Sequence, residues 1–242
     1  MGTSRLSRRG FLQATAIGAL ALGIVPGCSR EEEEMFTLYT FGDSILDCER
    51  YNREGVHPGQ LIVRNDDRLF PEFRGNDLSS HGPAQLEHRA VDGATVDDLP
   101  RQARGLKVAG PAAAILTIGG NDLLRGLVTD RGRGIEQFAQ QLDAFVRGLP
   151  IRPVLLGNVY DPSLGDDRRN FLGIDPAIAR ANHRRMNEAI ATIAGRYGAL
   201  VDLHGHFLEG DESWFTATIE PSLRGASEVR RVFLPHLLPL VK

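Results

Sequence analysis

A serine in a glycine-containing turn is the first residue of this sequence that could do chemistry. Ser44 belongs to the segment Gly42-Asp43-Ser44, which follows the apolar run at 35–41. A serine at a junction between a strand and a helix can act as a nucleophile, because N–H groups at the helix N-terminus can stabilise an oxyanion. The same position also suits a helix N-cap, which is a purely structural role.

Two further segments could complete a site for acyl transfer. Asn121 follows the apolar run at 112–119, and its side-chain amide can donate a hydrogen bond to an oxyanion. Gly93 lies in a short loop after the segment 86–91, where its backbone N–H could serve the same oxyanion. In both segments the alternative is a simple turn between two elements.

The elements around these residues place all three at one edge of a sheet. Apolar runs typical of strands alternate with helical patterns, which predicts a parallel sheet with helices on both faces. Ligands bind such a sheet at the carboxyl ends of its strands, where these residues fall. The predicted strands are 35–41, 86–91, 112–119, 153–160 and 198–203, and the predicted helices are 95–106, 134–148, 176–196 and 225–238.

The GDS segment at 42–44, Gly93 and the GGND segment at 119–122 resemble, in this order, blocks of the SGNH (GDSL) hydrolase family. The resemblance spans essentially all of 35–242 and implies a three-layer α/β/α, flavodoxin-like sandwich with a parallel sheet of about five strands. It implies a serine esterase that forms an acyl-serine on Ser44, without a metal or other cofactor. The backbone N–H groups of Ser44 and Gly93 and the side chain of Asn121 would form the oxyanion hole. The expected substrate is a small-molecule, carbohydrate or lipid ester.

The last block of the family, D-x-x-H-P-N-x-x-G, is altered in this chain. The segment 217–225 reads ATIEPSLRG, with Ala217 at the aspartate position and Glu220 at the histidine position. Glu220 is therefore a candidate general base. The ordinary pKa of glutamate, about 4.3, is low for a base that works near neutral pH, but burial could raise it. This hypothesis predicts a desolvated Glu220 within hydrogen-bonding reach of Ser44.

Two histidines offer an alternative base. His206 and His204 follow the predicted strand 198–203 and so fall at the same sheet edge. We place His206 ahead of His204, and either Asp202 or Asp211 could orient the ring. The H-x-H pair also invites a metal site, but no third ligand follows at a regular spacing, so we expect none.

A third hypothesis is a site that no longer turns over. The chain would then be a ligand-binding lipoprotein of the cell envelope with a degenerate hydrolase fold. The intact GDS, Gly93 and GGND segments favour the enzyme, because folding alone does not require all three. The formal net charge of -3 makes nucleic acid an unexpected partner.

The N-terminus has the features of a signal peptide over residues 1–27. Basic residues precede an uncharged run at 11–25, which is too short to span about 30 Å of hydrocarbon. The segment 7–12 (SRRGFL) resembles the twin-arginine export motif, and 25–28 (VPGC) resembles a lipobox. Cys28 would then carry lipid that anchors the protein to a membrane surface. Export through the twin-arginine machinery would place the protein at the periplasmic or extracellular face.

The rest of the chain is predicted to form a short polar tether at 28–34 and one domain at 35–242. Within the domain, the segment 49–86 is rich in Arg, Asn, Asp, Gly and Pro and has little periodicity. We expect it to be an irregular insertion that shapes the pocket.

Overall fold

The computed structural model describes residues 34–241. The predictions for the signal peptide at 1–27 and for most of the tether at 28–34, Cys28 included, lie outside this range.

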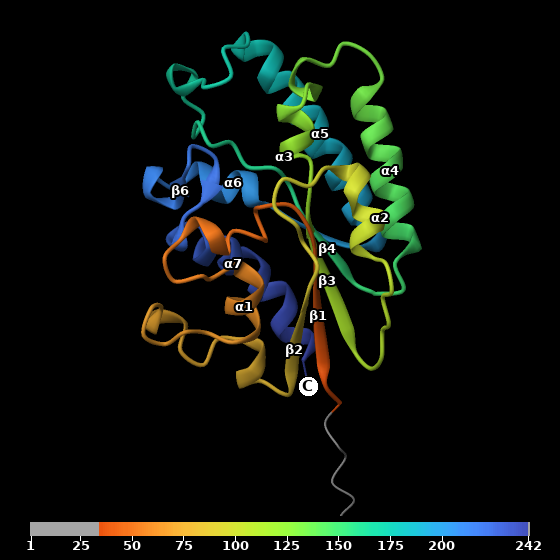
Figure 1. Ribbon diagram of the computed structural model, residues 1–242, viewed down its shortest axis with the longest axis vertical. Coiled ribbons are helices and arrows are strands. Elements are labelled where there is room, and N and C mark those ends of the chain that lie inside the picture. Colours follow the sequence, from red (N-terminus) through yellow and green to blue (C-terminus); the bar gives the residue numbers. More distant parts are fainter. Residues whose placement is uncertain (1–33, 242) are drawn as a thin grey trace, which may run out of the picture. The chain divides into compact units, whose positions relative to one another are not determined.

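A five-stranded parallel sheet forms the centre of the described domain (Figure 1). Its strand order is β2-β1-β3-β4-β5, so β1 and β3 lie in the middle. Every residue of β1 is buried, as expected for a parallel strand with helices on both sides. The strands are β1 Phe36–Gly42, β2 Ala84–His88, β3 Ala112–Thr117, β4 Val154–Gly157 and β5 Gly198–Val201.

Helices cover both faces of the sheet. On one face α1 and α7 pack on each other and on the sheet, and on the other α4 and α5 form a second pair (Figure 1). Successive strand residues point to opposite faces, and accordingly Leu38 of β1 belongs to the first core whereas Phe41 belongs to the second. The helices are α1 Pro58–Val63, α2 Leu99–Gln102, α3 Gly120–Leu124, α4 Gly134–Gly148, α5 Pro176–Tyr197, α6 Leu203–Leu208 and α7 Leu223–Leu237.

The three-layer architecture predicted from the sequence is confirmed. The predicted helix 134–148 coincides with α4, and the helix predicted over 176–196 is α5. Asp175 caps α5, since its carboxylate accepts hydrogen bonds from the backbone N–H groups of Ala177 and Ile178. The helix predicted over 95–106 is wrong in extent, because only α2 and a preceding 3-10 turn at Val96–Asp98 are helical.

The segment 49–86 is more regular than its composition indicates. It contains α1, which buries Leu61 and Ile62 against the sheet and α7. A six-residue helix that begins with proline and glycine has little intrinsic helical stability, so packing rather than local propensity holds it. Within the described residues, no helix is both long and apolar enough to cross a membrane.

Candidate active site

The turn that carries Ser44 depends on a glycine at the end of β1. Gly42 has a φ of 119°, and a Cβ atom there would lie 1.7 Å from the carbonyl oxygen of Thr117. Gln102 fixes this peptide from both sides: its side chain accepts from the Gly42 N–H at 2.8 Å and donates to the Gly42 carbonyl at 2.7 Å. The chain can therefore turn sharply and present Ser44, which is 8% exposed, at the carboxyl edge of the sheet.

Ser44 is not the N-cap of a helix. A single turn follows at 44–46, and the next helical residues are the 3-10 turn Glu49–Tyr51. The side chain that braces this turn is that of Asp43, whose carboxylate accepts from the Ile45 N–H at 3.2 Å and from the Thr117 hydroxyl at 2.9 Å. This correction to the sequence-based expectation leaves the Ser44 hydroxyl without that structural role.

The two candidate oxyanion residues lie on neighbouring segments that are joined to each other: Gly93 in the loop after β2 and Asn121 in the first turn of α3. The Asn121 amide donates to the carbonyl of Ala94 at 3.0 Å, and Arg125 donates to the carbonyl of Gly93 at 2.9 Å. Gly93 has a φ of 75°, which glycine adopts without strain. A primary amide has two N–H groups, so one proton of Asn121 is still free to bind an oxyanion. Asn121 and Ser44 line the same cavity.

A further bond ties the turn that carries Ser44 to the Gly93 loop. The carboxylate of Asp47, in the segment after Ser44, accepts from the backbone N–H of Asp92 at 2.8 Å. The same Asp47 contacts His88 at the end of β2 at 3.4 Å. Asp47 thus connects the segment after Ser44 to the end of β2 and to the loop that contains Gly93. These contacts constrain the positions of Ser44 and Gly93 relative to each other.

Glu220 lies beside Ser44 on a short antiparallel hairpin. The hairpin pairs β6 (Phe215–Thr216) with β7 (Glu220–Pro221), and its turn contains Ala217 and Thr218 with positive φ angles of 45° and 75°. The Glu220 side chain is 8% exposed. The Ser44 hydroxyl lies close enough to the carboxylate to act to lower the pKa of Glu220.

The net effect of the surroundings is to raise the pKa of Glu220. Burial is the largest cause, because desolvation penalises the charged form. The negative charge of Asp92 adds to the rise, whereas the interaction with Ser44 and the positive charge of Arg50 oppose it. A carboxylate in this environment is a stronger base than an ordinary glutamate.

A polar cluster of Arg50, Tyr51 and Asp92, which the sequence did not reveal, lies near the Glu220 carboxylate. Arg50 contacts Asp92 at 2.6 Å, and the hydroxyl of Tyr51 donates to the same Asp92 oxygen at 3.0 Å. Arg50 and Tyr51 come from the segment after the nucleophile turn, and Asp92 precedes Gly93. From the sequence, only the position of Asp92 next to Gly93 could have indicated that Asp92 belongs to the site. Arg50 and Tyr51 lie in a segment without a recognisable motif.

The histidines considered as alternative bases have other partners. His206 contacts the Glu228 carboxylate of α7 at 3.0 Å, and its ring lies 5.0 Å from that of Trp214. The His204 ring lies 4.8 Å from the ring of His183 and lines a neighbouring cavity, which shares His183 with the cavity beside Ser44 but does not include Ser44. Within residues 34–241, neither histidine contacts Ser44, and no group of three metal-binding side chains is assembled.

Two buried aspartates accompany the site. Burial raises the pKa of Asp43 to about 7, against the hydrogen bonds that it accepts from Thr117 and Ile45. Burial likewise raises the pKa of Asp122 to about 6, and the Val96 N–H partly offsets this effect. Both carboxylates organise backbone segments next to Ser44 and Asn121.

A match to a family model shows which protein family the chain belongs to. Residues 40–226 match the GDSL-like lipase/acylhydrolase family, which covers most of the chain and all the segments above. The chain is a member of this family. This GDSL-like hydrolase acts on ester bonds. No curated protein matches the sequence.

Solved structures share the fold of this GDSL-like hydrolase at low sequence identity. An acetyl xylan esterase variant from Geobacillus stearothermophilus is 18% identical, with a TM-score of 0.61 over 85% of this chain and 94% of the other. A lipase/acylhydrolase from Enterococcus faecalis is 16% identical, with a TM-score of 0.62 over 86% and 98%. An alpha/beta hydrolase enzyme from the metagenome of Lake Arreo, Spain, is 24% identical, with a TM-score of 0.58 over 85% and 96%.

Proposed function

We propose that this protein hydrolyses carboxylic esters through an acyl-serine intermediate, with Ser44 as nucleophile and Glu220 as general base. The observation that carries the proposal is the position of the buried Glu220 carboxylate next to Ser44, at the edge of a cavity that Ser44 and Asn121 line. A base must lie within hydrogen-bonding reach of the proton that it removes, and its pKa must approach the working pH.

In the first half of the reaction, Ser44 Oγ attacks the ester carbonyl carbon while its proton passes to the Glu220 carboxylate. The backbone N–H groups of Ser44 and Gly93 and the Asn121 amide hold the negative oxygen of the tetrahedral intermediate. The intermediate collapses to the acyl-serine, and the leaving alkoxide takes the proton from Glu220. In the second half, Glu220 removes a proton from water as the water oxygen attacks the acyl-serine carbonyl. The second tetrahedral intermediate then collapses with cleavage of the bond to Ser44 Oγ, which takes the proton back from Glu220, and the carboxylic acid is released.

A fluorophosphonate probe tests the nucleophile and the base together. We expect the wild-type protein to be labelled and Ser44→Ala to be inert. Glu220→Gln should react and turn over about 10²- to 10⁴-fold more slowly, the range typical of lost general base catalysis. Steady-state kcat/KM values for p-nitrophenyl ester hydrolysis by the same variants give the matching kinetic measurement.

The histidine alternative predicts the opposite pattern. If His206 were the base, oriented by Glu228, then His206→Gln and Glu228→Gln would abolish labelling and Glu220→Gln would not. His204→Gln tests the remaining candidate in the same way. A wild-type protein that binds esters but is never labelled would instead favour a degenerate, ligand-binding role.

We further propose that the protein is exported through the twin-arginine machinery and anchored by lipid at Cys28. The sequence motifs at 7–12 and 25–28 support this location. Substitution of Arg8 and Arg9 by lysine should block export, whereas Cys28→Ala should release an exported protein from the membrane fraction. Membrane association of Cys28→Ala equal to wild type would contradict the anchor.

A further inference from the structure

A cavity of about 150 Å³ opens beside the proposed nucleophile. Ser44 and Asn121 line it together with other residues of α3, the segment 159–172 and the first two turns of α5. Apolar side chains make up about half of its lining residues and most of its accessible lining surface. They include Ile45, Leu123, Leu124, Val128, Phe171 and Leu172. Leu124 and Phe171 are large apolar side chains that stay exposed, at 37% and 44%.

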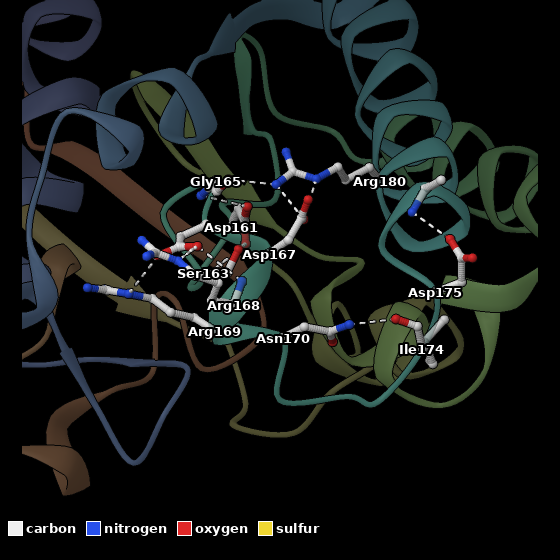
Figure 2. Close-up of polar contacts among 12 residues, drawn as sticks. Asp161, Ser163, Gly165, Asp167, Arg168, Arg169, Asn170, Ile174, Asp175 and Arg180 are labelled. Atoms are coloured by element: carbon white, nitrogen blue, oxygen red, sulfur yellow. Dashed lines mark hydrogen bonds and ion pairs between the residues drawn. The ribbon is translucent and has the colours of Figure 1, made fainter.

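A network of polar contacts fixes the wall made by the segment 161–175 (Figure 2). Arg180 of α5 donates to the Asp167 carboxylate at 2.6 Å and to the Gly165 carbonyl at 2.6 Å. Near the other end of the segment, the Asn170 amide donates to the Ile174 carbonyl at 2.5 Å. The segment is thus fastened to α5 and to itself, so the cavity has a defined shape without a ligand.

Several polar side chains that line the cavity, apart from Ser44 and Asn121, already have partners in the protein. The Asp161 carboxylate accepts from the Ser163 hydroxyl at 2.6 Å, and the charge of Asp167 is paired with Arg180. The ring of His183 bonds to the Val159 carbonyl at 2.8 Å. A charged or strongly polar ligand would have to break these contacts, whereas an apolar chain leaves them intact.

We propose that this cavity binds the acyl chain of the ester and selects uncharged chains of about six carbons. An engineered cavity of similar volume, about 150 Å³ and lined by Leu, Ile and Phe, holds one benzene molecule, which also has six carbons. The chain enters from the ester carbonyl between Ser44 and Asn121 and extends past Leu124 and Leu172. This inference rests on the proposed esterase function and assigns its substrate class.

The test is a series of p-nitrophenyl esters from acetate to dodecanoate with the intact protein. Burial of one methylene is worth about 0.8 kcal/mol, so kcat/KM should rise by about fourfold per added methylene. The rise should stop near hexanoate, where the cavity is full, and longer chains should gain nothing further. Acetate, the acyl group named for the acetyl xylan esterase neighbours, should be among the poorest substrates.

Variants of the cavity wall should move this profile in opposite directions. Leu124→Trp fills the cavity from an exposed position, so the ratio of hexanoate to acetate kcat/KM should fall at least about tenfold. Leu172→Ala enlarges the cavity, so the optimum should move to longer chains. Met35→Trp is the matched control, because Met35 is also exposed but precedes β1 at the opposite end of that strand from Ser44.

The outcomes separate the two levels of the proposal. Acetate hydrolysed as well as hexanoate by an active wild-type protein would overturn the chain-length assignment and leave the esterase intact. The same holds if Leu124→Trp and Leu172→Ala keep the wild-type profile. A wild-type protein that hydrolyses none of the esters would overturn the proposed function and, with it, this assignment.

Discussion

The hydroxyl of Tyr160 donates a hydrogen bond of 2.6 Å to the carbonyl of Ile219, the residue before Glu220. Tyr160 follows β4 and lines the cavity beside Ser44, whereas Ile219 belongs to the turn of the β6–β7 hairpin. The bond joins the hairpin to the carboxyl edge of the sheet and thereby fixes where the Glu220 carboxylate lies.

Loss of this bond should impair catalysis beyond its effect on stability. Tyr160→Phe keeps the ring contacts with Phe207 and Phe215 but removes the hydroxyl, so we expect about 1 kcal/mol of destabilisation and about a tenfold lower kcat/KM. Tyr39→Phe is the control, because the Tyr39 hydroxyl also donates to a backbone carbonyl, that of Lys107, at 3.0 Å. Equal kcat/KM for both variants, measured beside their denaturation curves, would contradict the positioning role.

The pH dependence of ester hydrolysis should report the titration of Glu220. A base acts only when deprotonated, so kcat/KM should fall as the pH falls through a midpoint above the ordinary glutamate pKa. Asp92→Asn removes a charge that raises this pKa, so the midpoint should move to lower pH. Arg50→Gln removes a charge that lowers it, so the midpoint should move to higher pH. Shifts in the same direction, or none, would count against Glu220 as the titrating group.

The buried Asp43 should make the fold more stable at acidic pH than at neutral pH. Its pKa is about 7 in the folded protein and 3.8 ordinarily, so the folded state binds the extra proton in between. The free energy of unfolding should therefore fall by about 3 kcal/mol through this group as the pH rises from 4 to 7. Asp43→Asn removes the titration, so the variant should gain about that much relative to wild type over the same range.

The comparison with wild type is essential because another buried group has the opposite effect. Burial lowers the pKa of His57 to about 3, so its contribution to stability grows as the pH rises toward its ordinary value. Urea denaturation of wild type and Asp43→Asn at several pH values gives the contribution of Asp43 to the free energy of unfolding as the difference between the two proteins. Parallel stability curves for the two proteins would contradict the prediction.

The turn before Ser44 should tolerate no side chain at Gly42. In Gly42→Ala the methyl group would collide with the Thr117 carbonyl, so we expect a loss of about 3 kcal/mol or more and little folded protein. Gly55→Ala is the control, since Gly55 also has a positive φ of 63° but faces open space. Gly55→Ala should lower the free energy of unfolding by only about 1–2 kcal/mol, the cost of a left-handed backbone conformation for a residue with a Cβ atom. Thermal melts of both variants measure the difference.

The sequence by itself determined the framework and the nucleophile side of the site. Alternation of apolar strands and amphipathic helices is a local pattern, so the five strands and the long helices α4 and α5 could be predicted from it. Parallel strands end at one edge, which is why Ser44, Gly93 and Asn121 could be placed together without coordinates. The short helix α1 escaped prediction because packing, rather than periodicity, stabilises it.

Only the tertiary structure decided which acidic or basic group faces Ser44. Glu220, His206 and His204 all follow elements near the same edge, and their order along the chain does not distinguish them. The β6–β7 hairpin turns Glu220 toward Ser44, whereas α7 presents Glu228 to His206. The Arg50–Asp92 pair was equally hidden, because it joins residues from two different loops. Such contacts depend on where loops come to rest in three dimensions, and no local sequence pattern encodes that.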